Sequence, residues 1–142
     1  MKLIKSSKIR KMIKDMWPNF KKLEEIYLQD GFYLSPKLTE LEIAVKESNV
    51  AKMKNLGDCD DYALFSNAFV KKYFIDKGMN KFNGKIYTIA YGEANGTMWN
   101  GWSDAHTANI AICEEGLILV EPQTEEIWKP NSYDDRLYFI RI

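Results

Sequence analysis

The chain has 142 residues, with 20 basic and 20 acidic side chains and 46% hydrophobic residues. This length and apolar content predict a single folded domain over residues 1–142. The balanced charge gives no reason to expect nucleic acid, and no apolar run is long enough to span a membrane. The basic start lacks the apolar stretch of a secretion signal, and the two cysteines lack zinc-site spacing. We therefore expect free thiols and a cytoplasmic protein.

The N-terminal part of the chain is predicted to be helical. Apolar residues recur at helical spacing over residues 6–17, namely Ile9, Met12, Ile13 and Met16. Basic residues lie between them, and Pro18 ends or kinks this amphipathic helix. Such a helix can bind a membrane surface or an acidic partner, but it more often packs on its own domain. With a second short helix over residues 20–27, we expect residues 1–26 to form a helical N-terminal extension.

A buried helix is predicted to begin at the sequence Asp58-Cys59-Asp60-Asp61. It is preceded by an extended segment at residues 33–36, a helix over 37–47 and a connector over 49–57. Asp58 is a good N-cap residue, and Asp61 completes a capping box. Cys59 is then the first helical residue, where the helix dipole favours a thiolate. Without further evidence, the better reading of Cys59 is an inert, packed thiol, because free cysteines are commonly buried.

The second half of the chain is predicted to form an antiparallel sheet. Residues that favour strands occur at 85–91, 105–113, 117–120, 125–128 and 137–142. A hairpin turn is predicted at residues 114–116, and a long loop over residues 92–104 carries Trp99 and Trp102. Helices followed by an antiparallel sheet indicate an α+β fold.

The only histidine, His106, is predicted near the start of a strand. A thiol at a helix start and a histidine at a strand start can form an ion pair in which the imidazole takes the thiol proton. A third group would orient the imidazole, and the candidates are Glu121, Asn109 and Gln123. A turn centred near residue 115 pairs Asn109 with residue 121, which would bring Glu121 diagonally within reach of His106.

Three blocks of this sequence resemble the papain-like cysteine peptidase domain at the C-terminal end of a mushroom agglutinin, and related small bacterial and phage proteins. The blocks are residues 58–63 (DCDDYA), 105–110 (AHTANI) and 121–127 (EPQTEEI). The first two also resemble bacterial transglutaminase-like peptidases, and the likeness runs from about residue 27 to the end.

The resemblance implies a papain-like fold, in which the Cys-bearing helix packs on the antiparallel sheet. It implies a catalytic triad of Cys59, His106 and Glu121 acting on a peptide or protein substrate. It also implies a calcium ion, or manganese in its place, beside Asp60 and Asp61. The residues give a separate reason to expect a cation: neighbouring carboxylates raise the pKa of the thiol, and a bound divalent cation would reverse that field.

These patterns leave three functions open. The first is a thiol hydrolase that cleaves peptide or amide bonds through Cys59, His106 and Glu121. The second is a non-catalytic binding module of the same fold, with Trp99 and Trp102 on its contact surface, since exposed tryptophan marks interfaces. The third is an acyl transferase of the transglutaminase type, in which an amine replaces water.

Overall fold

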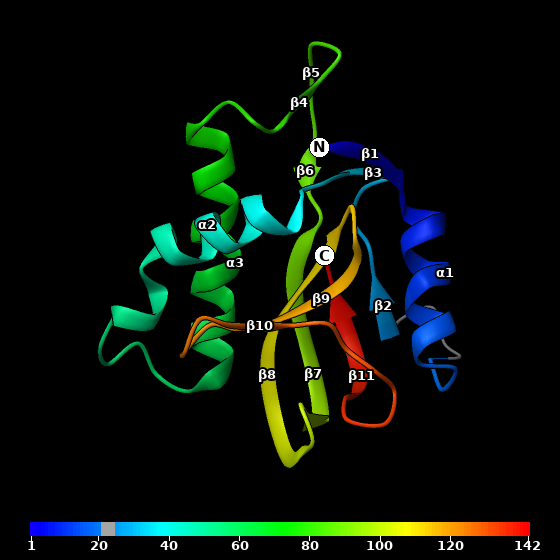
Figure 1. The fold of residues 1–142 in the computed structure, drawn as a ribbon, viewed down its shortest axis with the longest axis vertical. Helices are drawn as coiled ribbons and strands as arrows, with labels where there is room; N and C mark the ends of the chain where they lie inside the picture. Colours follow the sequence, from blue (N-terminus) through cyan, green and yellow to red (C-terminus); the bar gives the residue numbers. More distant parts are fainter. Residues whose placement is uncertain (21–24) are drawn as a thin grey trace.

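The computed structural model describes residues 1–20 and 25–142, and it confirms the α+β class (Figure 1). The helical elements are α1 (Ser6–Met16), α2 (Leu38–Ser48), the short 3-10 helix η2 (Val50–Lys52) and α3 (Cys59–Asp76). No helix in this described part of the chain is both long enough and apolar enough to cross a membrane.

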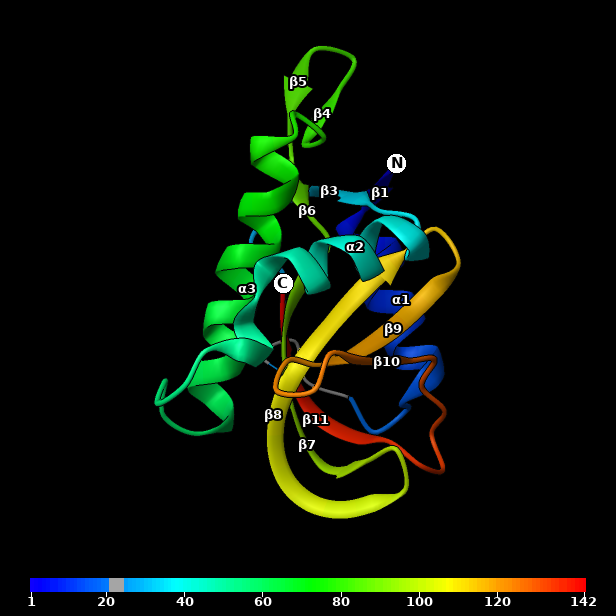
Figure 2. The same ribbon diagram turned by 60° about the vertical axis from the view of Figure 1, so that its left-hand side comes forward.

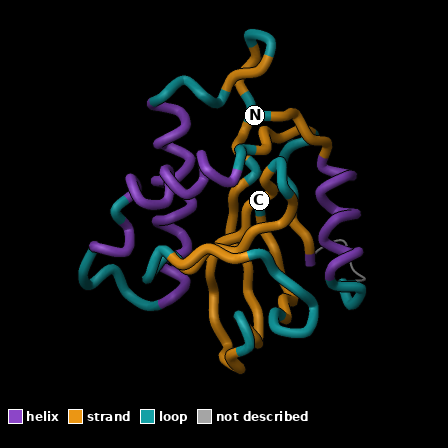
Figure 3. The backbone as a smooth tube through the Cα atoms, in the orientation of Figure 1, coloured by secondary structure: helices purple, strands orange, loops and turns teal. Residues whose placement is uncertain are grey.

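The main sheet has six strands, in the order β10-β9-β8-β7-β11-β2. Its strands are β2 (Ile26–Tyr27), β7 (Tyr91–Trp99), β8 (Trp102–Cys113), β9 (Gly116–Glu121), β10 (Glu126–Trp128) and β11 (Arg136–Arg141). The helices α2 and α3 lie on one side of this sheet and α1 lies on the other (Figures 1 and 2). The strands therefore form a central layer between helices, as Figure 3 shows.

Strand β8 separates two hydrophobic clusters, because its side chains point alternately to opposite faces. Ala111 and Cys113 belong to the cluster that contains Val70 and Phe74 of α3. The alternate residues of β8 belong to the cluster on the α1 side; they are Ala108, Ile110 and Ile112. From His106 to Cys113, where the pairing of β8 is regular, each residue thus points to one face according to whether its number is odd or even.

The first 26 residues contribute both a strand and a helix. Strand β1 (Lys2–Lys5) pairs with β3 (Phe32–Ser35), which also pairs with β6 (Thr88–Ile89). The amphipathic helix expected over residues 6–17 is present as α1, with Ile9 and Ile13 fully buried. The second helix expected over 20–27 lies partly outside the described residues, at 21–24; the described end of it, Ile26–Tyr27, is strand β2.

The prediction of a long loop over residues 92–104 is wrong, because these residues belong to a β-hairpin. Strands β7 and β8 pair along their length and turn at Asn100 and Gly101, whose φ angles are 47° and 83°. Glycines in this segment suggested a loop, but Gly92 and Gly96 lie in a strand and allow the close approach of β11. A Cβ at Gly92 would lie 2.0 Å from the carbonyl oxygen of Arg141 on β11, so only glycine allows this approach.

The predicted strand over 85–91 is divided in the structure. A projecting hairpin consists of β4 (Lys81–Phe82) and β5 (Lys85–Ile86), and it is followed by β6 and then by the start of β7 (Figure 1).

Buried hydrogen bonds fasten α3 to the hairpin. The side-chain amide of Asn109 donates to the carbonyl of Ala63 at 2.9 Å and to that of Gly92 at 3.0 Å. The hydroxyls of Ser66 and Tyr91 lie 2.7 Å apart, and burial raises the pKa of Tyr91. These contacts fix the rotation of α3 about its axis and its position along the sheet, which apolar packing alone does not specify.

Asn109→Leu is expected to destabilise the fold by on the order of 2–4 kcal/mol, because two buried carbonyl groups each lose a hydrogen bond from the Asn109 amide. Urea unfolding of both proteins measures this difference. Gln123→Leu removes an exposed amide instead and serves as the control, with little expected change. Equal stability of Asn109→Leu and the parent protein would show that these bonds do not hold α3 in place.

Candidate functional site

The N-terminus of α3 has the capping arrangement that the sequence predicts. The backbone N–H of Asp58 donates to Oδ2 of Asp61 at 3.1 Å, and Cys59 is the first helical residue. Gly57 precedes them with a φ angle of 127°, and a Cβ there would lie 2.0 Å from Asp61 Oδ2. The sequence Gly57-Asp58-Cys59 therefore sets the helix start through both its backbone freedom and its side chains.

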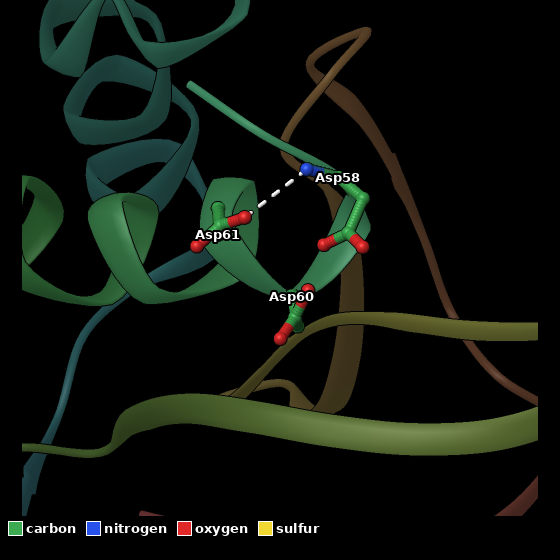
Figure 4. Close-up of side chains that lie close together, drawn as sticks. All are labelled: Asp58, Asp60 and Asp61. Atoms are coloured by element: carbon green, nitrogen blue, oxygen red, sulfur yellow. Dashed lines mark hydrogen bonds between the residues drawn. The ribbon is translucent and has the colours of Figure 1, made fainter.

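Three carboxylates gather at this helix start. Oxygens of Asp58, Asp60 and Asp61 lie within 4.8 Å of one another (Figure 4). A hydrogen bond to Asp60 and the charge of Asp60 raise the pKa of Asp58, because one shared proton relieves the repulsion. A divalent cation would relieve it in the same way. Calcium or manganese at Asp60 and Asp61 stays a prediction.

The structure brings His106 and Glu121 together across β8 and β9. His106 Nε2 lies 2.5 Å from Glu121 Oε2, and this contact raises the pKa of His106 despite partial burial. The strand register predicted from the sequence is wrong by one residue, because Asn109 pairs with Val120 rather than with residue 121. That shift puts Glu121 on the same face of the sheet as His106.

A small hollow surrounds this pair on the sheet, and we call it the tryptophan hollow. It has a volume of about 250 Å³. Its lining is Trp99, Asn100, Trp102, Asp104, His106, Glu121, Glu126 and Trp128. Trp99 is buried and meets the His106 ring edge-to-face, with centroids 5.7 Å apart. Trp102 is 78% exposed, so its ring is available to a ligand.

Cys59 is not part of this hollow. His106 has the same parity as Ala108 and Ile110, so a regular β8 directs it to the face away from α3, the helix that Cys59 begins. Among the described residues, no hydrogen bond joins the Cys59 thiol to His106. Among these three side chains, the structure shows a hydrogen bond between His106 and Glu121, and the catalytic role of Cys59 stays a prediction.

The other candidates from the sequence have structural partners. Asn109, once a possible orienter of His106, points to α3 and donates to Ala63 and Gly92. The backbone N–H of Gln123 donates to Glu121 Oε1 at 3.1 Å, which holds that carboxylate. Cys113 is a buried free thiol, and burial raises its pKa to about 12.

The sequence did not single out Asp104, Glu126 or Trp128 as site residues. A usable signal was present: Trp99 and Trp102 flank Asn100-Gly101, a pair of residues typical of a tight hairpin turn. Treating those residues as a turn would have placed Trp102 on the strand that carries His106 and Trp99 opposite Trp102 on the neighbouring strand.

Comparison with known proteins finds similarity at the level of structure. No family model and no curated protein matches the chain. A complex of PSL1a with E64 is similar with a TM-score of 0.74 and 18% identity, over 99% of this chain and 51% of that chain. The Polyporus squamosus lectin bound to the human-type influenza-binding epitope Neu5Acα2-6Galβ1-4GlcNAc is similar with a TM-score of 0.73 and 20% identity. That match covers 99% of this chain and 49% of the lectin chain.

These findings contradict the family inferred from the sequence blocks. One similar structure is named as a lectin, neither is named as a peptidase, and no peptidase family model matches. The assignment to papain-like or transglutaminase-like cysteine peptidases, with its thiol hydrolase activity, is therefore corrected. At these identities the likeness concerns the fold, and this chain spans about half of each similar chain.

Glu121→Gln should lower the pKa of His106 towards its ordinary value of 6.5, because the charged acceptor is lost. Since the folded pKa is raised, the stabilisation from this pair is complete below pH 6.5 and is lost as pH rises through the folded pKa. NMR titration of the imidazole measures the first effect, and urea unfolding at several pH values measures the second. Glu126→Gln, which alters a neighbouring carboxylate of the hollow, is the control. An unchanged titration of His106 in Glu121→Gln would contradict the pairing.

Calcium should raise the melting temperature if the three carboxylates bind it in the folded state. Mass action predicts roughly 2.7 kcal/mol of stabilisation at a hundredfold excess over the dissociation constant. Asp60→Asn should abolish this shift, whereas Asp15→Asn, which alters an exposed carboxylate on α1, should keep it. A melting temperature that changes with neither calcium nor chelator would contradict the predicted cation site.

Proposed function

We propose that this chain is a non-catalytic binding module that holds a neutral saccharide in the tryptophan hollow. The observation that carries the proposal is the exposed ring of Trp102 beside the His106–Glu121 pair. An indole face packs against the apolar face of a sugar ring, while carboxylate and imidazole groups bind the hydroxyls at its edge. The similarity to a chain named as a lectin supports the same class of ligand.

The charge of the hollow favours a neutral ligand over an acidic one. Asp104, Glu121 and Glu126 contribute three carboxylates to the lining, against the one imidazole of His106. A sialic acid carboxylate placed there would meet like charge in a partly desolvated site. The sialylated epitope is bound by a chain about twice as long as this one, so we propose only the class of ligand for this chain.

The size of the hollow favours a short ligand. Its volume of about 250 Å³ lies below the range of roughly 300–1,000 Å³ typical of sites for drug-sized molecules. We therefore expect it to hold a single sugar ring, with the rest of a glycan outside. Both cysteines are free thiols, which supports a reducing, cytoplasmic setting as part of the same proposal.

Calorimetric titration with Galβ1-4GlcNAc and with Neu5Acα2-6Galβ1-4GlcNAc tests this function. We expect the neutral disaccharide to bind more tightly. Trp102→Ala should weaken its binding at least tenfold, because the stacking face is lost, which corresponds to about 1.4 kcal/mol. Tyr138→Ala, which removes an exposed ring elsewhere on the sheet, should leave the affinity unchanged.

Cys59→Ala separates binding from chemistry. The module should bind the disaccharide equally well without this thiol, because Cys59 does not line the hollow. Failure of both sugars to bind the parent protein would contradict the proposal that the hollow binds a saccharide. Cleavage of a casein or gelatin substrate that Cys59→Ala abolishes would contradict the non-catalytic assignment itself.

A further inference from the structure

A second and larger hollow is lined by residues of α3, β5 and β6 and by Asp30, Gly31 and Phe32. The β4–β5 hairpin projects beyond the C-terminal end of α3 (Figure 1). The volume of this hollow is about 520 Å³, and it shares no residue with the tryptophan hollow. Much of its wall is apolar, formed by Phe32, Ile75, Ile86 and Ile89. Three of these side chains remain substantially exposed: Phe32 at 42%, Ile75 at 55% and Ile86 at 70%. An apolar ligand body would cover them.

The positive charge in this hollow is Lys71. Burial lowers the pKa of Lys71, and the charges of Glu93 and Asp30 oppose that shift. Glu93 forms its ion pair with Arg141, at 2.8 Å, rather than with Lys71. Within the described ranges 1–20 and 25–142, Lys71 therefore has no ion-pair partner, although it lines a partly desolvated site.

The negative charge in the same hollow is Asp30. Its Oδ2 accepts a hydrogen bond from the Thr88 hydroxyl at 2.6 Å, which orients the carboxylate without neutralising it. Asp30 and Lys71 are close enough for their charges to interact, yet they form no salt bridge with each other. The two opposite charges thus remain available to a ligand that carries both.

Asn80 adds a polar side chain to the wall of this hollow. It lines the hollow, and although the residue is only 8% exposed, its amide is not a buried group left without a partner. Its backbone carbonyl accepts from Tyr87, which fixes its place beside the β4–β5 hairpin. The amide therefore offers a polar donor and acceptor to a ligand in the hollow, without requiring one.

We propose that this hollow binds a free amino acid with an apolar side chain. The α-carboxylate would pair with Lys71, the α-ammonium group with Asp30, and the Asn80 amide would bind whichever group lies nearer. The side chain would cover Phe32, Ile75 and Ile86. A fatty acid satisfies only Lys71, and an apolar amine satisfies only Asp30, so the zwitterion is the ligand class that uses every charge of the site.

NMR titration of the whole ¹⁵N-labelled chain with three probes tests this proposal. The probes are L-leucine, 4-methylpentanoate, which lacks the ammonium group, and L-leucinamide, which lacks the carboxylate. Leucine should shift the amide signals of Ile86 and Ile89 and bind at least tenfold more tightly than either analogue. Equal affinity for leucine and one analogue would show that the missing group makes no contact, and would overturn the proposal.

Two variants assign the charges. Lys71→Met should weaken leucine binding at least tenfold and leave leucinamide unaffected, whereas Asp30→Asn should weaken leucine and leave 4-methylpentanoate unaffected. Lys72→Met and Asp76→Asn, which alter the neighbouring exposed ion pair on α3, are the matched controls and should change nothing. No shift at Ile86 or Ile89 with millimolar leucine would overturn the proposal, as would equal losses in the controls.

Discussion

The alternation of side chains along β8 is the constraint on which the rest of this structure depends. One face of the strand belongs to α3, through Asn109, Ala111 and Cys113, and the other belongs to the core beneath α1. Because the strand period is two, every residue of the regular part of β8, from His106 to Cys113, is committed to a face once any one of them is fixed. Asn109 fixes it, since its amide satisfies a carbonyl on α3 and another on β7.

This constraint decides what the candidate site contains. His106 is an odd number of residues from Asn109, so it is directed away from α3, and the register of β8 and β9 brings Glu121 to the same side. The hairpin turn at Asn100 then returns Trp99 and Trp102 to the neighbourhood of the pair. Aromatic rings, carboxylates and an imidazole meet in one hollow, and the thiol at the start of α3 is not among them.

The sequence allowed much of the fold to be predicted. The amphipathic pattern of residues 6–17 and the capping box at Asp58 and Asp61 are local signals, and α1 and α3 follow them. The hairpin over residues 92–104 was missed because Gly92 and Gly96 are required by β11, a strand more than 35 residues further along the chain. A local sequence pattern cannot indicate that a distant strand will pack this closely against a glycine.

The candidate site could be predicted only in part, for a related reason. The proximity of His106 and Glu121 was expected, yet from a register that was wrong by one residue, and a slip of one residue exchanges the two faces of a strand. The likeness of three short blocks to a peptidase family led to a hydrolase, whereas the comparison of whole structures leads to a chain named as a lectin. Short sequence blocks indicate where a helix or strand starts. They carry less information on which face of the sheet each side chain occupies.

The most direct test of the binding account uses the four tryptophans as reporters. Their indole N–H signals can be followed by ¹H–¹⁵N NMR while Galβ1-4GlcNAc is added. Trp99, Trp102 and Trp128 line the hollow, whereas the Trp17 indole donates to the carbonyl of Asp135 at 2.8 Å in the core. The account predicts that the signals of the three lining tryptophans shift together with the sugar concentration and that the Trp17 signal stays fixed. A titration that leaves all four signals in place, or that moves Trp17 alone, would contradict it.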